Sequence, residues 1–193
     1  MATENLKDFI LASGSPQRRA LLCQIGLNPK KIAPADIDEH VLSEEKPLPY
    51  IRRIARAKAE AVAGLFPEEN ILSADTIIVV GQKIIQKSPD DATQTQVMQM
   101  LSGRTHRVIT SVCLIDKQGK VSQKTVTTKI VMKHLTEQEI TDYVSSKEWC
   151  GVAGYKIEGM LAGFVKKIIG SYTSVVGLPL YETKSMLNGA GVY

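Results

Sequence analysis

The stretch "FILASGSPQRR", residues 9–19, decides how the chain begins to fold. Its apolar half predicts a short buried strand that stops at Ser13. Ser15 has a side chain suited to a helix N-cap, and Pro16 is a residue favoured at the first helical position. The stretch therefore predicts a strand that ends in small hydroxyl side chains and leads directly into a helix.

Two adjacent arginines, Arg18 and Arg19, lie at the start of that helix. Exposed backbone N–H groups at a helix N-terminus, with guanidinium groups beside them, suit an anion such as phosphate. A capped helix whose arginines are merely solvated explains the same residues. Neither a Walker A loop nor a GxGxxG turn is present, and both interpretations remain open from this stretch alone.

Strands and helices alternate along the rest of the chain. Apolar periodicity, capping residues and turn residues predict these elements. They are an extended piece over 31–37, a loop at Pro47 and Pro49, a helix over 50–66, a strand over 70–80, a return strand over 83–86, a helix starting at Ser88 and Pro89, a hairpin of 106–116 with 120–132, a helix over 136–145 with a Thr136–Glu139 capping box, and a helix over 180–187. The pattern predicts an α/β fold with a mixed sheet. Residues 1–193 are expected to form one domain, with room for two lobes around a cleft.

Composition argues against several classes of function. The balance of 24 Lys and Arg against 20 Asp and Glu gives a charge of +4, without a dense basic tract, and aromatic residues make up 5% of the chain. Nucleic-acid binding is therefore not expected. No apolar run approaches a membrane span, so no membrane partner is expected either. Three widely spaced cysteines without a CxxC pair indicate a reducing compartment, and we expect the protein in the cytoplasm.

Two carboxylates and two lysines are candidates for a site. Asp75 interrupts an apolar strand, where a carboxylate needs a partner, a metal ion or backbone N–H groups. Glu39 ends an extended piece, whereas Lys58 and Lys87 would each, taken alone, be ordinary surface lysines. Together they supply cations for a polyphosphate, carboxylates for Mg²⁺ and a base for water.

At these residues the sequence resembles the Maf family of nucleoside triphosphate pyrophosphatases. The resemblance extends from Phe9 to Thr183, nearly the whole chain. The family motifs are SxSPxR at residues 13–18, an acidic pair at 38–39, KA at 58–59, ADT at 74–76, KP altered to KSP at 87–89, and the distal segments "LSGRTHRVIT" and "GYKIEG…GSYTSVVGLPL".

The resemblance implies hydrolysis of a nucleoside triphosphate to the monophosphate and pyrophosphate, with a divalent cation, Mg²⁺ or Mn²⁺. By carry-over, Asp75 is the proton acceptor that activates water, and Glu39 and Asp75 hold the metal. Ser13, Arg18, Lys58 and Lys87 hold the triphosphate. The implied fold is an elongated mixed sheet flanked by helices, with a deep cleft, similar to inosine triphosphatases. Family members are often dimeric, so a homodimer is also an expectation.

Three residues, Gln17, Thr76 and Glu158, are expected to affect specificity. The family branch that acts on dTTP and UTP carries arginine in place of Gln17 and glutamine in place of Glu158. The branch that acts on 7-methyl-GTP carries glutamate at the second position and an aromatic residue at the first. An ionised carboxylate only accepts hydrogen bonds, which suits the two adjacent donors of a guanine edge. Glu158 therefore favours a guanine-type base, with dTTP and UTP next.

Two other functions are compatible with these residues. A Ser/Lys hydrolase would use Ser13 as nucleophile and Lys58 as base, although no GxSxG elbow supports it. A nucleotide-binding regulator of cell division, without significant turnover, would use the same pocket. Turnover of an ester would favour the first, and tight triphosphate binding without pyrophosphate release would favour the second.

Overall fold

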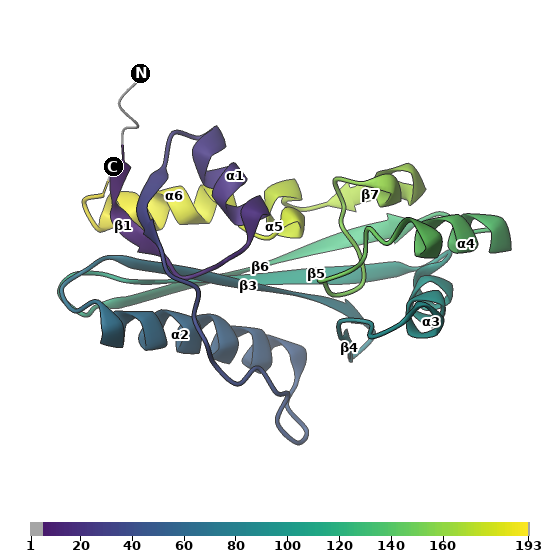
Figure 1. The fold of residues 1–193 in the computed structure, drawn as a ribbon, viewed down its shortest axis with the longest axis horizontal. Coiled ribbons are helices and arrows are strands. Elements are labelled where there is room, and N and C mark those ends of the chain that lie inside the picture. The colour runs from purple at the N-terminus through teal and green to yellow at the C-terminus, as the bar shows by residue number, and fades with distance from the viewer. Residues whose placement is uncertain (1–5, 193) are drawn as a thin grey trace.

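Seven strands form one mixed sheet in the computed structural model, which describes residues 6–192 (Figure 1). The order along the sheet is β2-β1-β3-β5-β6-β7, and β4 pairs with β3 off this path. β1 is parallel to β2 and β3, whereas the other pairs are antiparallel. The strands are β1 (Leu6–Leu11), β2 (Asn28–Ile32), β3 (Ile71–Val80), β4 (Lys83–Ile85), β5 (Thr105–Ile115), β6 (Val121–Met132) and β7 (Val165–Ile169).

One edge of β3 has a gap between its two short neighbours. β1 pairs with β3 only at Ile71 and Leu72, and β4 pairs with it from Ile78 onward. β5 covers the opposite edge along almost the whole strand. Residues 73–77 therefore lack a strand partner on one side within the described structure. Asp75 lies in the middle of this gap.

Helices cover both faces of the sheet. α2 lies against one face, and α1, α5 and α6 lie on the other, while α3 and α4 pack together near β4 and β7 (Figure 1). This arrangement confirms the predicted α/β fold with a mixed sheet flanked by helices. The helices are α1 (Pro16–Gln24), α2 (Pro47–Leu65), α3 (Asp91–Leu101), α4 (Glu137–Ser146), the 3₁₀ helix η1 (Met160–Phe164), α5 (Tyr172–Val176) and α6 (Leu180–Gly189).

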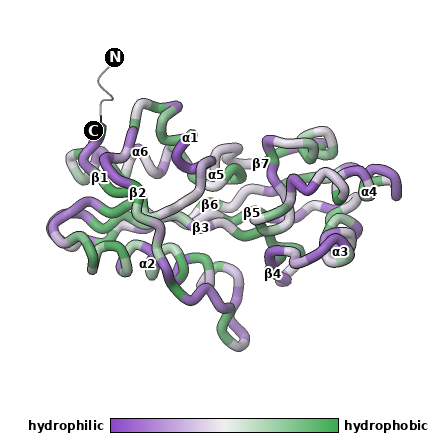
Figure 2. The backbone as a smooth tube through the Cα atoms, viewed as in Figure 1, coloured by the Kyte–Doolittle hydropathy of each residue, from purple (hydrophilic) through white to green (hydrophobic). Residues whose placement is uncertain are grey.

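The long helix α2 is amphipathic and buries one face against β3 and β5. Figure 2 shows hydrophobic and hydrophilic stretches alternating along it. Tyr50, Ile54, Lys58 and Val62, spaced four residues apart, are all buried. Residues spaced by four lie on one face of a helix. The buried face therefore directs Lys58 toward the sheet, not toward solvent.

Pro47 and Pro49 do not form a loop, contrary to the sequence prediction, because both lie in the first turn of α2. The first four N–H groups of a helix have no partner within it, so a proline there sacrifices no hydrogen bond. The helix consequently begins three residues earlier than its apolar periodicity indicates.

Two further boundaries differ from the sequence prediction. The extended piece expected over 31–37 is instead strand Asn28–Ile32, because it pairs with β1 and the ladder ends where β1 ends. The helix expected to start at Ser88 and Pro89 is capped by Asp90, whose side chain accepts from the Thr93 N–H. The β5–β6 hairpin and the Thr136 capping box confirm their predictions.

None of the helices among residues 6–192 is sufficiently long and apolar to cross a membrane.

His106 on β5 is buried, and its Nε2 lies 2.6 Å from the Tyr155 hydroxyl. Burial lowers the pKa of His106 from 6.5 to about 4. As the pH falls, the unfolded chain therefore binds a proton before the folded one does. The stabilisation from the neutral imidazole is complete above about pH 6.5 and is lost as the pH falls toward 4.

We expect the wild type to lose about 2 kcal/mol more unfolding free energy between pH 7 and pH 5 than the variant His106→Gln. Glutamine keeps a hydrogen-bonding group but does not titrate. Urea denaturation at both pH values measures the difference. Equal pH dependence in the two proteins would show that His106 is not held neutral by the fold.

Candidate active site

A cavity of about 570 Å³ lies at the gap in the edge of β3. Cavities of this size accommodate small-molecule ligands. Its walls come from the start of α1, the loop before α2, one face of α2, β3, the end of β4, and the segments 151–158 and 175–177. The structure brings all nine predicted site residues to this cavity: Ser13, Gln17, Arg18, Glu39, Lys58, Asp75, Thr76, Lys87 and Glu158.

Lys58 binds two carboxylates at the centre of the cavity. Its Nζ lies 2.8 Å from Asp75 Oδ1 and 2.9 Å from Glu39 Oε1. The Lys58 and Asp75 side chains are only 10% and 13% exposed, whereas Glu39 is 49% exposed. A nearly buried carboxylate needs a cationic partner, and Lys58 supplies it to Asp75. Glu39 reaches the same ammonium group from the solvent side.

Ser13 and Arg18 form a second polar group beside this ion pair. Ser13 Oγ accepts hydrogen bonds from Arg18 Nη1 at 2.9 Å and from Ser15 N–H at 3.3 Å. These two bonds use both lone pairs of the hydroxyl and leave its hydrogen uncommitted, and Ser13 lines the cavity. Arg18 Nε also donates to Gly177 O at 2.9 Å, which fixes the guanidinium. Burial lowers the pKa of Arg18, and the charges of Asp75 and Glu39 oppose this effect.

Asp75 and Thr76 point to opposite faces of β3, since successive strand residues alternate. Asp75 contacts Lys58 on the side of the sheet that α2 covers. Thr76 lies on the other side, beside Gly177: a Cβ atom added to Gly177 would lie 3.8 Å from Thr76 Oγ1. The cavity contacts both residues, so it passes through the gap in the sheet. Thr76 Oγ1 lies 2.9 Å from Thr110 Oγ1.

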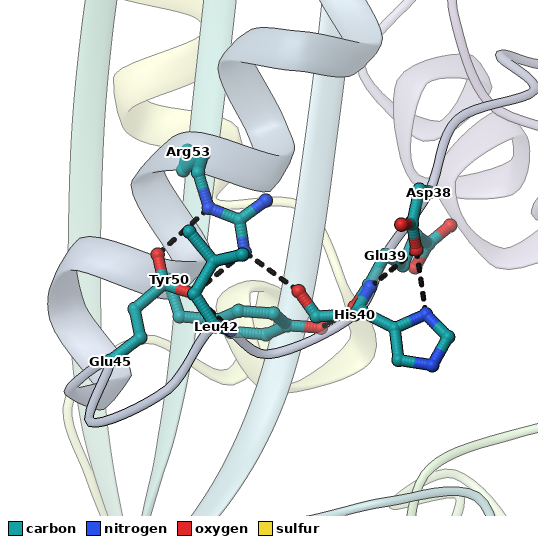
Figure 3. A network of polar contacts seen from close by, with 7 residues as sticks. All are labelled: Asp38, Glu39, His40, Leu42, Glu45, Tyr50 and Arg53. Atoms are coloured by element: carbon teal, nitrogen blue, oxygen red, sulfur yellow. Dashed lines mark hydrogen bonds and ion pairs between the residues drawn. The ribbon is translucent and has the colours of Figure 1, made fainter.

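The loop that carries Glu39 is fastened to α2 by Tyr50 and Arg53 (Figure 3). Tyr50 donates its hydroxyl to Glu39 O at 2.9 Å, and Arg53 donates to His40 O and to both Glu45 oxygens. Burial, followed by the charges of Asp75 and Glu39, raises the pKa of Tyr50 to about 12. Tyr50 is therefore a neutral donor at physiological pH, and it anchors the backbone at Glu39.

Sequence reasoning missed several residues that line the cavity. Tyr155 and Lys156 lie in its wall, within the segment "GYKIEG" that already carried the resemblance. A lysine in that segment could have been identified as a further cation. Gly177 could not, because its carbonyl acts on Arg18 only through the tertiary fold.

The residues present can hold a divalent cation only in part. The described residues contain no group of three or more His, Cys, Asp or Glu side chains placed to bind a metal. Glu39 and Asp75 nevertheless lie close together, since one oxygen of each contacts Lys58 Nζ, and Mg²⁺ is commonly held by one or two carboxylates together with substrate phosphates and water. The donor set therefore fits a cation that phosphate oxygens help to hold.

A family model described as "Maf-like protein" matches residues 8–190. The chain belongs to the Maf family. This finding confirms the resemblance noted in the sequence, whose motifs the structure gathers at one cavity.

Curated relatives cover nearly the whole chain. One from Paramagnetospirillum magneticum is 46% identical over 184 residues, which are 95% of this chain and 97% of that protein. Another, from Agrobacterium fabrum, is 42% identical over 98% of this chain and 95% of its own length. Both are named dTTP/UTP pyrophosphatase.

A solved nucleoside triphosphatase and dITP/XTP pyrophosphatase from Mycobacterium abscessus has a TM-score of 0.44 to this structure, at 14% sequence identity. The match covers 66% of this chain and 75% of that one.

The variant Lys58→Met is expected to lower the free energy of unfolding by about 3 kcal/mol, because it leaves Asp75 without its cation. In the double variant with Asp75→Asn, the loss should be smaller than the sum of the single losses. Urea denaturation of the four proteins measures this coupling. Arg56→Met on the same helix breaks an exposed pair with Glu60 and should cost little. Strictly additive losses would contradict the coupling of Lys58 and Asp75.

Proposed function

We propose that this protein hydrolyses a nucleoside triphosphate to the monophosphate and pyrophosphate. The convergence of Asp75, Lys58 and Glu39 at a cavity that Ser13 and Arg18 also line carries the proposal. Relatives named dTTP/UTP pyrophosphatase support the same reaction class. The site thus combines a carboxylate able to act on water with cations able to hold phosphate.

The charges of the cavity suit a polyphosphate. Four cationic side chains and three acidic ones line it. A triphosphate carries about four negative charges, so a divalent cation and the lining cations together offset most of them. The charged lining residues are the cations Arg18, Lys58, Lys87 and Lys156, and the acids Glu39, Asp75 and Glu158.

In the proposed mechanism, Asp75 accepts a proton from the attacking water as the anhydride between the α- and β-phosphates breaks. Lys58, already beside Asp75, orients this carboxylate and neutralises phosphate charge. Arg18 and the Ser13 hydroxyl hold phosphate oxygens from the other side of the gap, and Lys87 does so from the end of β4. Glu39 and Asp75 would hold a divalent cation together with phosphate oxygens, and such a cation would supply Lewis-acid polarisation of the phosphoryl group.

For the base, two observations favour different substrates. The relatives' names favour dTTP and UTP. Glu158 lines the cavity as an exposed carboxylate, and this supports a guanine-type base such as 7-methyl-GTP as the second candidate. Gln17 lines the same cavity and offers an amide, not an aromatic face for a methylated base.

Pyrophosphate release should appear with dTTP, UTP, GTP or 7-methyl-GTP in the presence of Mg²⁺ or Mn²⁺. The variant Asp75→Asn should reduce kcat by at least a hundredfold, because it removes the proton acceptor. Asp142→Asn, an exposed residue of α4 that does not line the cavity, is the control and should leave kcat unchanged. Tight triphosphate binding without pyrophosphate release would favour a nucleotide-binding regulator instead, and turnover of an ester without triphosphate turnover would favour a Ser/Lys hydrolase.

Glu158→Gln is expected to move the ratio of kcat/KM between dTTP and 7-methyl-GTP toward dTTP by about tenfold. An amide both donates and accepts, as the pyrimidine edge requires, and such a contact discriminates by roughly 1–3 kcal/mol in nucleic-acid sites. Glu68→Gln, which is exposed and does not line the cavity, is the matched control. An unchanged ratio would show that Glu158 does not read the base.

Chelation of divalent cations should abolish turnover, and Mg²⁺ or Mn²⁺ should restore it. Glu39→Gln should raise the Mg²⁺ concentration needed for half-maximal activity by about tenfold, because it removes one carboxylate oxygen donor. Titration with Mg²⁺ at saturating substrate measures this shift. Full activity in excess chelator would show that turnover does not need a divalent cation.

The proposed substrate and the free thiols Cys23, Cys113 and Cys150 are consistent with the cytoplasm. The homodimer implied by the family resemblance stays a prediction, which light scattering of the purified protein would test.

A further inference from the structure

Gln94 on α3 is a fully buried polar residue that does not line the cavity. Its Oε1 accepts a hydrogen bond from Ser88 Oγ at 2.8 Å, and its Nε2 donates to Gly154 O at 2.7 Å. A buried amide is costly unless it is paired, and these two bonds satisfy both ends of the Gln94 side chain. One side chain thus joins two segments that are far apart in the sequence.

Both segments lead into the cavity wall. Ser88 directly follows Lys87, the cation expected to hold phosphate, and Gly154 lies within the segment 151–158 that ends at Glu158. An isolated antiparallel β-bridge also joins Lys87 to Ala153. Gln94, which lies outside the cavity, therefore links the segment of Lys87, the predicted phosphate contact, to the segment of Glu158, the predicted base contact.

The Gly154 end of this connection packs closely against β3 and β4. Gly154 has φ of +72°, and an added Cβ would lie 2.9 Å from Ile78 Cδ1 and 3.5 Å from Ile85 Cγ2. The backbone here is consequently pressed against β3 and β4, in a conformation that favours glycine. The next residue, Tyr155, is held by its hydroxyl contact to His106. These contacts of residues 153–155 lie directly before Lys156 and Glu158 in the cavity wall.

The Ser88 end coincides with this chain's departure from the family's KP motif. Here Ser88 separates Lys87 from Pro89. Its hydroxyl donates to Gln94 and not into the cavity. Ser88 is thereby tied to α3.

We propose that Gln94 is a positioning residue that sets the separation between Lys87 and the 156–158 wall of the cavity. It touches neither the cavity nor, in consequence, the substrate. Its effect on turnover rests on the proposed function, whereas the connection between the two segments does not. Loss of the connection should weaken triphosphate binding much more than it slows the chemical step, because Asp75 and Lys58 lie on other elements.

The experiment compares Gln94→Leu, Ser88→Ala and their double variant with two controls. Gln96→Leu makes the same change at an exposed position of α3, and Ser88→Thr keeps the hydroxyl. KM and kcat are measured with the best triphosphate. Hydrogen–deuterium exchange of segments 85–89 and 151–158 is measured without any ligand.

We expect Gln94→Leu to raise KM about tenfold, with kcat changed less than threefold, and to speed exchange in both segments. Ser88→Ala should raise KM about threefold, and the double variant should be no worse than Gln94→Leu, because both changes break one chain of bonds. Gln96→Leu and Ser88→Thr should behave as the wild type.

Unchanged KM with a lower melting temperature in Gln94→Leu would overturn the proposal and make Gln94 a residue of stability only. Faster exchange at 85–89 alone would also overturn it, because the segments would then be independent. If Gln94→Leu fails to fold, Ser88→Ala takes its place. Faster exchange of segment 151–158 in Ser88→Ala would then support the connection, and unchanged exchange there would overturn it. If the wild type hydrolyses no triphosphate, the proposed function fails, and the exchange measurement still tests the connection.

Discussion

The structure of the site depends on a carboxylate placed within an otherwise apolar strand. Asp75 lies where β3 lacks a neighbour on one edge, and its charge is nearly buried. Burying a charge is unfavourable unless an opposite charge accompanies it, and Lys58 does so from the buried face of α2. A well-packed apolar pair would often serve stability as well, so stability alone does not account for the ion pair.

Short strands produce the cavity. β1 and β4 cover opposite ends of the same edge of β3, and the open stretch between them admits a ligand through the sheet. The chain turns into the cavity directly after each of these strands, at Ser13 after β1 and at Lys87 after β4. Residues that are distant in sequence therefore face the same space, from both faces of one sheet.

The parts of the site differ in how firmly they are held. Asp75 is fixed by a long paired strand, whereas Glu39 lies on an exposed loop that Tyr50 and Arg53 fasten to α2 (Figure 3). A carboxylate on such a loop can adjust to a ligand, while Asp75 stays in place on its strand. The segment that carries Glu158 is held at its other end by backbone and buried side-chain contacts. The proposed function would use this division, with Asp75 on a well-paired strand and Glu39 on a loop.

Local periodicity, capping chemistry and ordered motifs sufficed to predict the α/β class, the β5–β6 hairpin, the Thr136 cap and the family. It also singled out nine residues that share one cavity. Three sets of contacts became visible only in the folded chain: Lys58 pairs with both Asp75 and Glu39, Gly177 accepts a hydrogen bond from Arg18, and Gln94 joins Ser88 to Gly154. Those contacts join elements far apart in the chain, and no local pattern encodes which distant strand or helix a side chain will meet. The start of α2 and the extent of β2 were mispredicted for related reasons: first-turn prolines are tolerated where N–H groups lack partners, and a ladder ends where its neighbour ends.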